Sequence, residues 1–341
     1  MIPYRLGFAV KVLGNGGLKT ADTRRWQSKP HLSRSLELLD VAFDYLDAID
    51  VRVFRLSSST VPYGTHPDLP RFEYRRQLAE CAPGLERLGE KARALGLRLS
   101  THPGQYTVLG APDEGLAHRA RLDVEQDTAL LDALAAGPES AVVVHVGGAY
   151  GDREASLDRW ARSFERLSEQ ARRRLAVEHD ERLFDVADVL RLHERTGVRV
   201  VFDLHHHRCN PGWDGPAEPL AAALDTWPAG IRPKAHVSSP RTELREVNGL
   251  PRPPLVEQHA DFLSPWDLLA LLDAADRPLD VMVEAKAKDL AVLWLRRTLE
   301  RVAPEAAAAE ELGRAASGRA APRGRRRGRA ERSPARMRAR S

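Results

Sequence analysis

Histidine and acidic residues recur at the ends of short apolar runs in this sequence, where they could do chemistry together. Six successive runs end in such residues, which are His102, His145, Glu178, Asp203 with the three histidines of 205–207, Lys234 with His236, and Glu284. His66 and His259 lie in two intervening segments. Imidazole and carboxylate ligands without thiolates suit Mn, Zn or Fe rather than a closed structural zinc site. One four-coordinate ion needs fewer donors, so the pattern predicts a cluster of two or three divalent cations.

Such a cluster suits the displacement of a phosphodiester, because the cations hold both the attacking and the leaving oxygen. Any one of these residues alone has a simpler explanation, and His145 by itself could be a hydrogen-bonded core histidine. The joint pattern favours metal, since buried charges are costly unless they are paired or bound to an ion.

Two points stay open at this level. Spacing does not decide which of His205, His206 and His207 is a ligand. Lys234 shares a strand face with His236, and an ammonium ion there would repel the cations. Either Lys234 forms an ion pair with Asp or Glu, or its amine is carboxylated and becomes an anionic oxygen donor.

The elements that would position these residues alternate regularly. Short β-branched runs occur at 5–10, 51–56, 98–102, 141–147, 175–180, 198–206, 232–238 and 280–286. Helical patterns lie at 33–50, 74–96, 118–134, 155–174, 185–197, 217–226, 264–276 and 289–302. The first begins at a serine N-cap, and Pro83 kinks or splits the second.

Eight strand–helix units predict an α/β protein with a single (β/α)8 TIM barrel, whose active site lies where strands meet the following helices. An open doubly wound sheet is the rival fold. The stretch "LGNGG" at 13–17 lacks the full spacing of the phosphate loop that such a sheet often has.

Charge divides the chain into two parts. The net charge of +4 combines −3 from residues 1–302, which we assign to the barrel, with +7 from residues 303–341. The second part has eleven Arg, four Glu and almost no large apolar side chain. It cannot bury enough surface to offset its ordering entropy, so we expect a basic C-terminal tail that is disordered from about Gly313 onward. The tail is either merely solvated or a nonspecific phosphate-binding arm.

No stretch of eighteen apolar residues predicts a membrane span, and the N-terminal apolar run is too short for a secretory signal. Cys81 and Cys209 do not make a disulfide framework. We therefore expect a protein of the reducing cytoplasm.

Six motifs make the sequence recognisable. In order they are "LSTHPGQY", "VVHVGGAYG", "VEHDERL", "FDLHHHRCNPG", "PKAHVSS" and "DVMVEAKAKD". Together they resemble the UV damage endonuclease family over about residues 5–290. The resemblance implies a TIM-barrel DNA repair nuclease of the wider group that includes endonuclease IV and xylose isomerase. Its members cut the DNA backbone immediately 5′ to a lesion such as a UV photoproduct, leave a 3′-hydroxyl, and use divalent ions, often manganese. Zinc and magnesium are the alternatives.

The resemblance also assigns residues. The family's ligand positions match His102, His145, Glu178, Asp203, His206, His236, His259 and Glu284. Lys234 matches a modified lysine, and we count it as catalytic with Glu178 and His66. Gln105 and Tyr106 match a pair that enters the duplex at the damage. A cross-linked base stacks poorly and is easily extruded, so a ring can fill the vacated stack while an amide meets the orphaned bases. The alternative is a loop that packs on its neighbour.

The first strand departs from the family. Many relatives have Tyr and Asn in the segment that reads "GFAVKV" here. Phe8 can stack on a base but has no hydroxyl, so the departure concerns the range of lesions rather than cleavage. The next loop places Arg24 and Arg25 beside Trp26, which suits contact with a DNA backbone, although a solvated loop has the same composition.

Two alternative functions remain. An abasic-site endonuclease of the endonuclease IV type would differ in its wedge residues, and "HPGQY" favours the UV-damage branch. A metal-dependent sugar isomerase or epimerase would need fewer metals and a small polyol pocket. Salt separates these classes, because DNA cleavage weakens steeply as salt rises. The expected partner is damaged double-stranded DNA, without a membrane or an obligate protein partner, and we expect a nucleoid-associated monomer.

Overall fold

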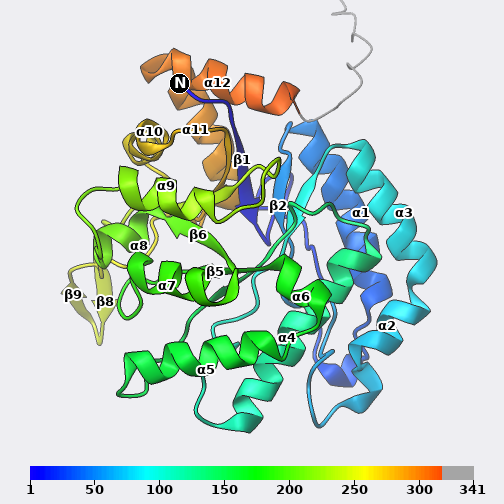
Figure 1. Ribbon diagram of the computed structural model, residues 1–341. Helices are drawn as coiled ribbons and strands as arrows, with labels where there is room; N and C mark the ends of the chain where they lie inside the picture. Colours follow the sequence, from blue (N-terminus) through cyan, green and yellow to red (C-terminus); the bar gives the residue numbers. More distant parts are fainter. Residues whose placement is uncertain (317–341) are drawn as a thin grey trace, which may run out of the picture.

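Eight parallel strands form the centre of the computed structural model, which describes residues 1–316 (Figure 1). They are β1 (Tyr4–Ala9), β2 (Val53–Arg55), β3 (Arg98–Ser100), β4 (Val142–His145), β5 (Leu175–Glu178), β6 (Arg199–Asp203), β7 (Lys234–Val237) and β10 (Leu279–Val283). Hydrogen bonds join them in the order β3-β2-β1-β10-β7-β6-β5-β4. Thr101, directly after β3, pairs with Val142 of β4 and closes the sheet. The expected (β/α)8 TIM barrel is confirmed.

Helices surround these strands, as Figure 1 shows. They are α1 (Leu32–Ala48), α2 (Tyr74–Glu80), α3 (Ala82–Ala94), α4 (Glu114–Ala133), α5 (Arg153–Glu165), α6 (Glu169–Arg174), α7 (Val186–Thr196), α8 (Leu204–Cys209), α9 (Ala217–Asp225), α10 (Pro265–Ala274), α11 (Lys288–Val302) and α12 (Pro304–Ala315). Pro83 lies in the first turn of α3, so the expected helix at 74–96 is split in two. Among residues 1–316, no helix is both long and apolar enough to cross a membrane.

The N-cap of α1 differs from the expected serine. The helix begins at Leu32, and its N-cap is His31, whose Nδ1 accepts a hydrogen bond from the backbone N–H of Ser33. The imidazole nitrogen does here what a serine hydroxyl does at other helix starts, because it satisfies one of the free N–H groups of the first turn.

The strand register brings the candidate ligands to one level of the barrel. His145 is aligned with Glu178 across β4 and β5, and Asp203 with His236 across β6 and β7. These residues lie at or near the carboxyl ends of their strands, an end that we call the barrel mouth. In this fold the active site lies at that end.

A buried ion network closes the opposite end of the barrel. Asp280, in β10, accepts hydrogen bonds from Arg5 Nε at 2.6 Å and Arg98 Nη1 at 2.7 Å. Burial would raise the pKa of Asp280, but its hydrogen bond with Arg5 and the charge of Arg98 lower it to about 2. Asp280 is therefore paired and structural at this end, and the candidate ligands are at the mouth.

The segment after Val302 corrects the expected domain boundary. Residues 304–315 are not part of a disordered tail, because they form α12, which packs on β1 and α11 (Figure 1). Tyr4 Oη donates to the carbonyl of Ala306 at 3.1 Å, and Arg296 Nη2 donates to Glu310 at 2.6 Å. The small buried residues Ala306, Ala309 and Gly313 let the helix approach the strand closely. The rest of the expected tail, 317–341, lies outside the described residues.

Two further features differ from the expected elements. The strand expected to run to residue 206 ends at Asp203, and the three histidines belong to α8. Between β7 and α10 an antiparallel hairpin forms from β8 (Arg245–Val247) and β9 (Leu250–Arg252). Its turn residues Asn248 and Gly249 both have positive φ, as a tight hairpin turn requires.

Candidate metal centre

Glu178 is the centre of the cluster at the barrel mouth. Its Oε1 lies 2.9 Å from His236 Nδ1 and 3.4 Å from His206 Nδ1. Its Oε2 lies 3.3 Å from His102 Nε2 and 3.8 Å from His145 Nε2. One carboxylate from β5 thus lies beside four histidines from four other segments of the chain.

The other predicted ligands complete this arrangement. Three groups have ligand atoms within 4.8 Å of one another, and they are His102–His145–Glu178, Glu178–Asp203–His206 and Asp203–His236–Glu284. Glu178 and Asp203 each belong to two groups, so the groups are contiguous. His259 joins at the edge, with Nδ1 at 3.7 Å from Glu284 Oε2. The structure therefore brings all eight predicted ligand residues together.

Several polar atoms of these residues are buried without a hydrogen-bond partner. They are Glu178 Oε2, Asp203 Oδ2, His145 Nδ1 and His236 Nε2. A buried carboxylate oxygen without a hydrogen bond is expensive, and a bound cation removes that cost. Nitrogen and oxygen donors in three adjoining groups fit divalent ions, so the residues present suit the predicted cluster.

The consecutive histidines of α8 point in three directions, because successive helical residues are about 100° apart. His206 faces the cluster, with Nδ1 held at 3.0 Å by the carbonyl of His179. His205 packs against His259 and Cys209, and His207 Nε2 meets the carbonyl of Gly215 at 3.0 Å. Of the three histidines, His206 is therefore the one whose ring faces the cluster.

Asp203 connects the strand to this helix. Its Oδ1 accepts hydrogen bonds from the backbone N–H groups of His205 at 2.7 Å and His206 at 2.9 Å, so it is the N-cap of α8. One oxygen is used for capping and the other stays available for a cation. Hydrogen bonds to one oxygen of a carboxylate fix the direction in which its other oxygen can meet a cation.

The charges of the cluster keep Glu178 ionised. Burial opposes ionisation of Glu178, but the neighbouring His236 and His145 hold its pKa well below the usual range. Burial also opposes protonation of His206, yet Asp203 and Glu178 raise its pKa to about 9. The cluster therefore attracts positive charge, as a cation site must.

Lys234 lies in the barrel interior beside the cluster. Its side chain is fully buried, and Nζ donates to Ser100 Oγ at 2.6 Å. Among residues 1–316 it forms no ion pair with a carboxylate, so the simpler expectation for this lysine is not met. Burial and the charges of Arg98 and Arg55 lower its pKa well below the usual range. This shift favours the neutral amine over the ammonium ion.

Two predicted site residues lie away from the cluster. Phe8 is fully buried and packs edge-on against Phe54 at 5.4 Å, so the expected stacking of Phe8 on a DNA base is contradicted. Its position in β1 puts the ring in the core. His66 is exposed in the segment after β2, with Nδ1 accepting from the N–H of Asp68 at 3.2 Å, and it belongs to none of the three groups.

The "HPGQY" loop extends outward from the first ligand. His102 Nδ1 lies 3.0 Å from the carbonyl of Pro103, which directs Nε2 toward Glu178. Gln105 and Tyr106 follow at the tip, where Tyr106 is 85% exposed. The loop is anchored behind the tip, since Thr107 Oγ1 donates to Asp123 Oδ2 at 2.8 Å.

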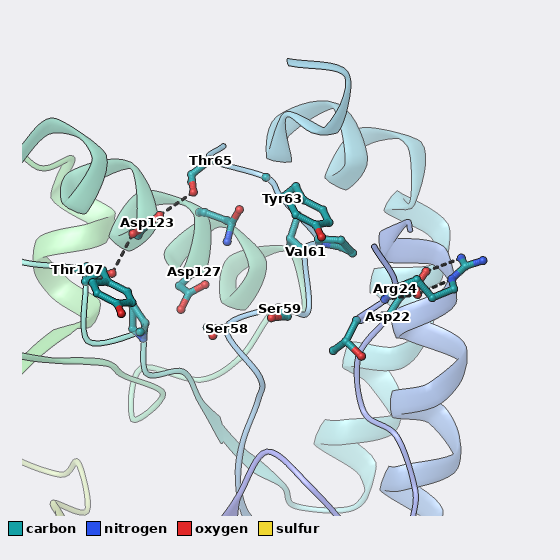
Figure 2. Close-up of a pocket in the computed structure, with 17 residues that line it drawn as sticks. Asp22, Arg24, Ser58, Ser59, Val61, Tyr63, Thr65, Thr107, Asp123 and Asp127 are labelled. Atoms are coloured by element: carbon teal, nitrogen blue, oxygen red, sulfur yellow. Dashed lines mark hydrogen bonds and ion pairs between the residues drawn. The ribbon is translucent and has the colours of Figure 1, made fainter. Parts of the chain in front are cut away.

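A pocket of about 380 Å³ lies behind this tip (Figure 2). Asp123 joins two of its walls, because its other oxygen accepts from Thr65 Oγ1 at 2.7 Å. Asp127 lines the floor, and burial raises its pKa to about 7. The pocket holds carboxyl groups and no free cation among its described lining, so it does not suit a phosphate.

The loop after β1 has the exposure expected of a contact surface. Trp26 is 42% exposed and Arg25 is exposed beside it. Arg71 packs over the Trp26 ring at 5.2 Å. Arg24, however, is bound to the buried Asp22, with Nε at 2.7 Å from Oδ1, so much of its charge is already compensated.

Comparison with known proteins shows to which family the chain belongs. The family model for UV-endonuclease UvdE matches residues 20–310. The chain belongs to the UvdE family. A UV DNA damage endonuclease of Bacillus pumilus is 31% identical over 280 residues, which cover 81% of this chain and 82% of that protein.

Solved structures agree on the fold of this UvdE family member. The crystal structure of SacUVDE superposes with a TM-score of 0.74 at 24% identity and covers 88% of this chain and 99% of that one. Endonuclease IV from Thermus thermophilus gives a TM-score of 0.53 at 17% identity, with the same shares covered. These likenesses extend the barrel assignment to most of the chain.

Basic residues at the mouth were missed as site residues. Arg55 is the last residue of β2, and its Nη1 is bonded to Glu284. Arg241 and Lys288 lie beside the same carboxylate in a second pocket. The signal was present for Arg55, because it is a charged residue at the carboxyl end of the apolar run "VRVFRL".

Proposed function

We propose that this UvdE family member is a DNA repair endonuclease that hydrolyses the phosphodiester backbone immediately 5′ to UV photoproducts and other distorting lesions. The observation that supports this most is Glu178, whose carboxylate meets four histidines at the barrel mouth of a chain that matches the family over residues 20–310. The named relatives act on UV-damaged DNA, and the same substrate is proposed for this chain.

We propose that the eight ligand residues hold two or three divalent cations, with manganese first and zinc or magnesium as alternatives. Bound cations of this kind lower the pKa of water and stabilise charge on phosphate oxygens. The chain's own residues prepare the site. The carbonyl of His179 fixes the ring of His206, and Arg55 balances the charge of Glu284. Glu178 stays ionised between its histidines.

We further propose that Lys234 is carboxylated. Its neutral amine would attack CO2, forming a C–N bond to Nζ and releasing one proton. The resulting carbamate is an anion and supplies oxygen donors where an ammonium would repel cations. Burial of Lys234 beside Arg98 supports a neutral amine. Intact mass after gentle handling should show the added carboxylate, and activity should rise with bicarbonate. A fully active enzyme with an unmodified Lys234 would remove this part of the proposal.

Gln105 and Tyr106 are proposed as the wedge that enters the duplex at a lesion. The exposed ring of Tyr106 at the tip of a loop anchored by His102 and Thr107 supports this role. Arg25 and Trp26 are proposed as backbone contacts because they are exposed. His66 is retained as a catalytic candidate only for a DNA-bound conformation. We also propose that the enzyme acts as a cytoplasmic, nucleoid-associated monomer.

The experiment that tests the function maps the cut. A duplex with a single thymine dimer, a duplex with one abasic site and an undamaged duplex are incubated with the manganese-loaded full chain. We expect a nick directly 5′ to the dimer, with a 3′-hydroxyl that a polymerase extends, and activity that falls as salt rises. Cleavage only at the abasic site would favour an enzyme of the endonuclease IV type. Turnover of a ketose or aldose without DNA cleavage would favour the sugar isomerase.

A further inference from the structure

A second pocket opens beside the metal centre. Its volume is about 370 Å³, and His259 and Glu284 lie in its wall, so it shares two candidate ligands with that centre. The cations of its lining are Arg55, Arg241, Lys286 and Lys288. Glu257 is its other acid, but this carboxylate is bonded to Arg182. The pocket therefore has more positive than negative charge next to the reactive end of the barrel.

Part of this positive charge has no counterion in the protein. Glu284 forms its ion pairs with Arg55, His236 and His259, and within residues 1–316 neither Lys286 nor Lys288 belongs to an ion pair. The Nε atom of Arg55 is buried and has no hydrogen-bond partner. A buried donor left unpaired costs free energy, so the pocket suits an anionic acceptor.

Lys288 lines this pocket from a strained backbone conformation. Its φ is 53°, in the left-handed region that a residue with a side chain seldom adopts, and it is the first residue of α11. The next residue fixes the turn, because Asp289 accepts hydrogen bonds from Leu13 N at 2.7 Å and Gly14 N at 2.9 Å. Strain that is maintained in this way clusters at functional sites.

The surroundings of the Lys288 amine also favour an anion. Burial and the charges of Arg55 and Lys11 lower its pKa, while only Glu284 opposes them. An ammonium ion in this position gains from a further negative partner, because Glu284 is already paired with Arg55, His236 and His259. Lysine binds phosphate as a point charge, which suits an internucleotide phosphate.

We propose that this pocket binds a backbone phosphate of the DNA substrate next to the one that is cut, with Lys288 and Lys286 as the contacting residues. The proposal rests on the proposed function, because it needs DNA at the metal centre. The shared wall of His259 and Glu284 sets the spacing between the two phosphates. A phosphate held here fixes the register of the strand, so that the scissile bond faces Glu178.

The test is a double-mutant cycle between protein and DNA. Lys288→Met keeps a long unbranched chain and removes the charge. The partner change replaces one phosphate at a time near a thymine dimer by a neutral methylphosphonate. Binding and single-turnover cleavage are measured with the manganese-loaded full chain. At one position we expect each change alone to weaken binding by about tenfold, and both together by little more than either alone. The salt slope of Lys288→Met should be smaller by about one.

Controls make the result specific. Arg172→Met removes one positive charge from the exposed surface of α6. Its effect on binding should be independent of every methylphosphonate, so that the two fold-changes multiply. Lys286→Met is the second variant if Lys288→Met does not fold, because Lys286 is exposed. Metal content should equal that of wild type. Independent effects at every phosphate, or loss of metal in both lysine variants, would overturn the proposal. A wild-type enzyme that cuts no dimer duplex would instead refute the proposed function.

Discussion

Tyr106 presents its ring to solvent at the tip of a loop whose base is fixed on both sides. His102 precedes it at the candidate metal centre, and Thr107 behind it is bonded to Asp123. The ring of Tyr106 is 85% exposed and contributes little packing to the fold, which agrees with the proposed contact with DNA. Removing the ring should therefore affect DNA and not stability.

Replacing Gln105 and Tyr106 by Ala tests this at the residue scale. Stacking is worth about 1–3 kcal/mol per base, so we expect affinity for UV-damaged duplex to fall by about one to two orders of magnitude. Affinity for undamaged duplex should hardly change, because phosphate contacts dominate there. Trp294→Ala, which removes an exposed ring from α11, is the control. Unchanged discrimination in the double variant would make the loop an ordinary surface loop.

Asp127 gives a second prediction at this scale. Burial raises its pKa to about 7, whereas an unfolded aspartate titrates near 4. The folded state therefore binds the extra proton between about pH 4 and pH 7, and stability falls as pH rises through that window. Above pH 7 the full cost applies, on the order of 4 kcal/mol. Asp127→Asn has no charge to bury, so its Tm should exceed that of wild type at pH 8 by more than at pH 5.

The control for this prediction is Asp68→Asn, which changes an exposed aspartate. Its Tm difference from wild type should be the same at both pH values. If the Tm difference of Asp127→Asn is also independent of pH, then the carboxyl of Asp127 is ionised in the folded protein throughout this range.

The residues that the sequence could not place are those whose neighbours decide their role. His102, His145 and Glu178 were predictable because each ends an apolar strand, and strand ends meet at one side of a barrel. The spacing could not show which of His205, His206 and His207 faces the cluster, because that depends on where α8 begins. The helix begins there because Asp203 is its N-cap. Phe8 looked like a surface ring by analogy, but its strand turns it into the core against Phe54.

At the scale of elements, α12 is the main departure from expectation. Its composition, rich in Ala, resembles a segment that cannot form a core, which explains the mistaken boundary at Val302. Yet alanine favours helix, and Pro304 suits the first turn. Ala306 and Gly313 are small enough to lie against β1 at the barrel end that Asp280 closes. Periodicity reveals helices that bury large side chains, and α12 buries small ones.

Gly313→Ala tests the docking of α12. A Cβ atom at this position would lie 1.9 Å from the carbonyl oxygen of Tyr4, so helix and strand must separate. Overpacking of this kind costs about 1–3 kcal/mol. We expect a Tm lower by at least about 2 °C, with cleavage at saturating substrate unchanged because the mouth is at the other end.

Gly115→Ala is the matched control in the first turn of α4, where the added methyl meets only the side chains of Asp113 and Arg119. The Tm of this variant should not fall, because alanine favours the helix over glycine. Equal Tm values for Gly313→Ala and wild type would mean that α12 is not held on β1 in solution.

At the scale of the whole molecule, charge is distributed unevenly along the chain. Residues 317–341 contain ten Arg and one Glu, a net charge of +9, while the barrel mouth has acidic ligands and a basic pocket. If the C-terminal segment binds DNA, a chain ending at Ala316 should bind undamaged duplex more weakly and with a flatter salt dependence. Single-turnover cleavage at saturating substrate should not change. Identical binding isotherms across a salt series for the full and shortened chains would leave the segment without a role in DNA binding.

The central claim is that metal held around Glu178 cuts UV-damaged DNA, and one plasmid assay tests it directly. UV-irradiated and undamaged supercoiled plasmids are incubated with wild type or Glu178→Gln, each with manganese or with a chelator, and metal content is measured on the same samples. The amide keeps the shape of Glu178 and removes its charge. We predict nicking of the irradiated plasmid only by wild type with manganese, more than one ion per wild-type chain, and an unchanged fold with reduced metal in Glu178→Gln. Full nicking by Glu178→Gln, or by wild type in chelator with no bound metal, would contradict the account.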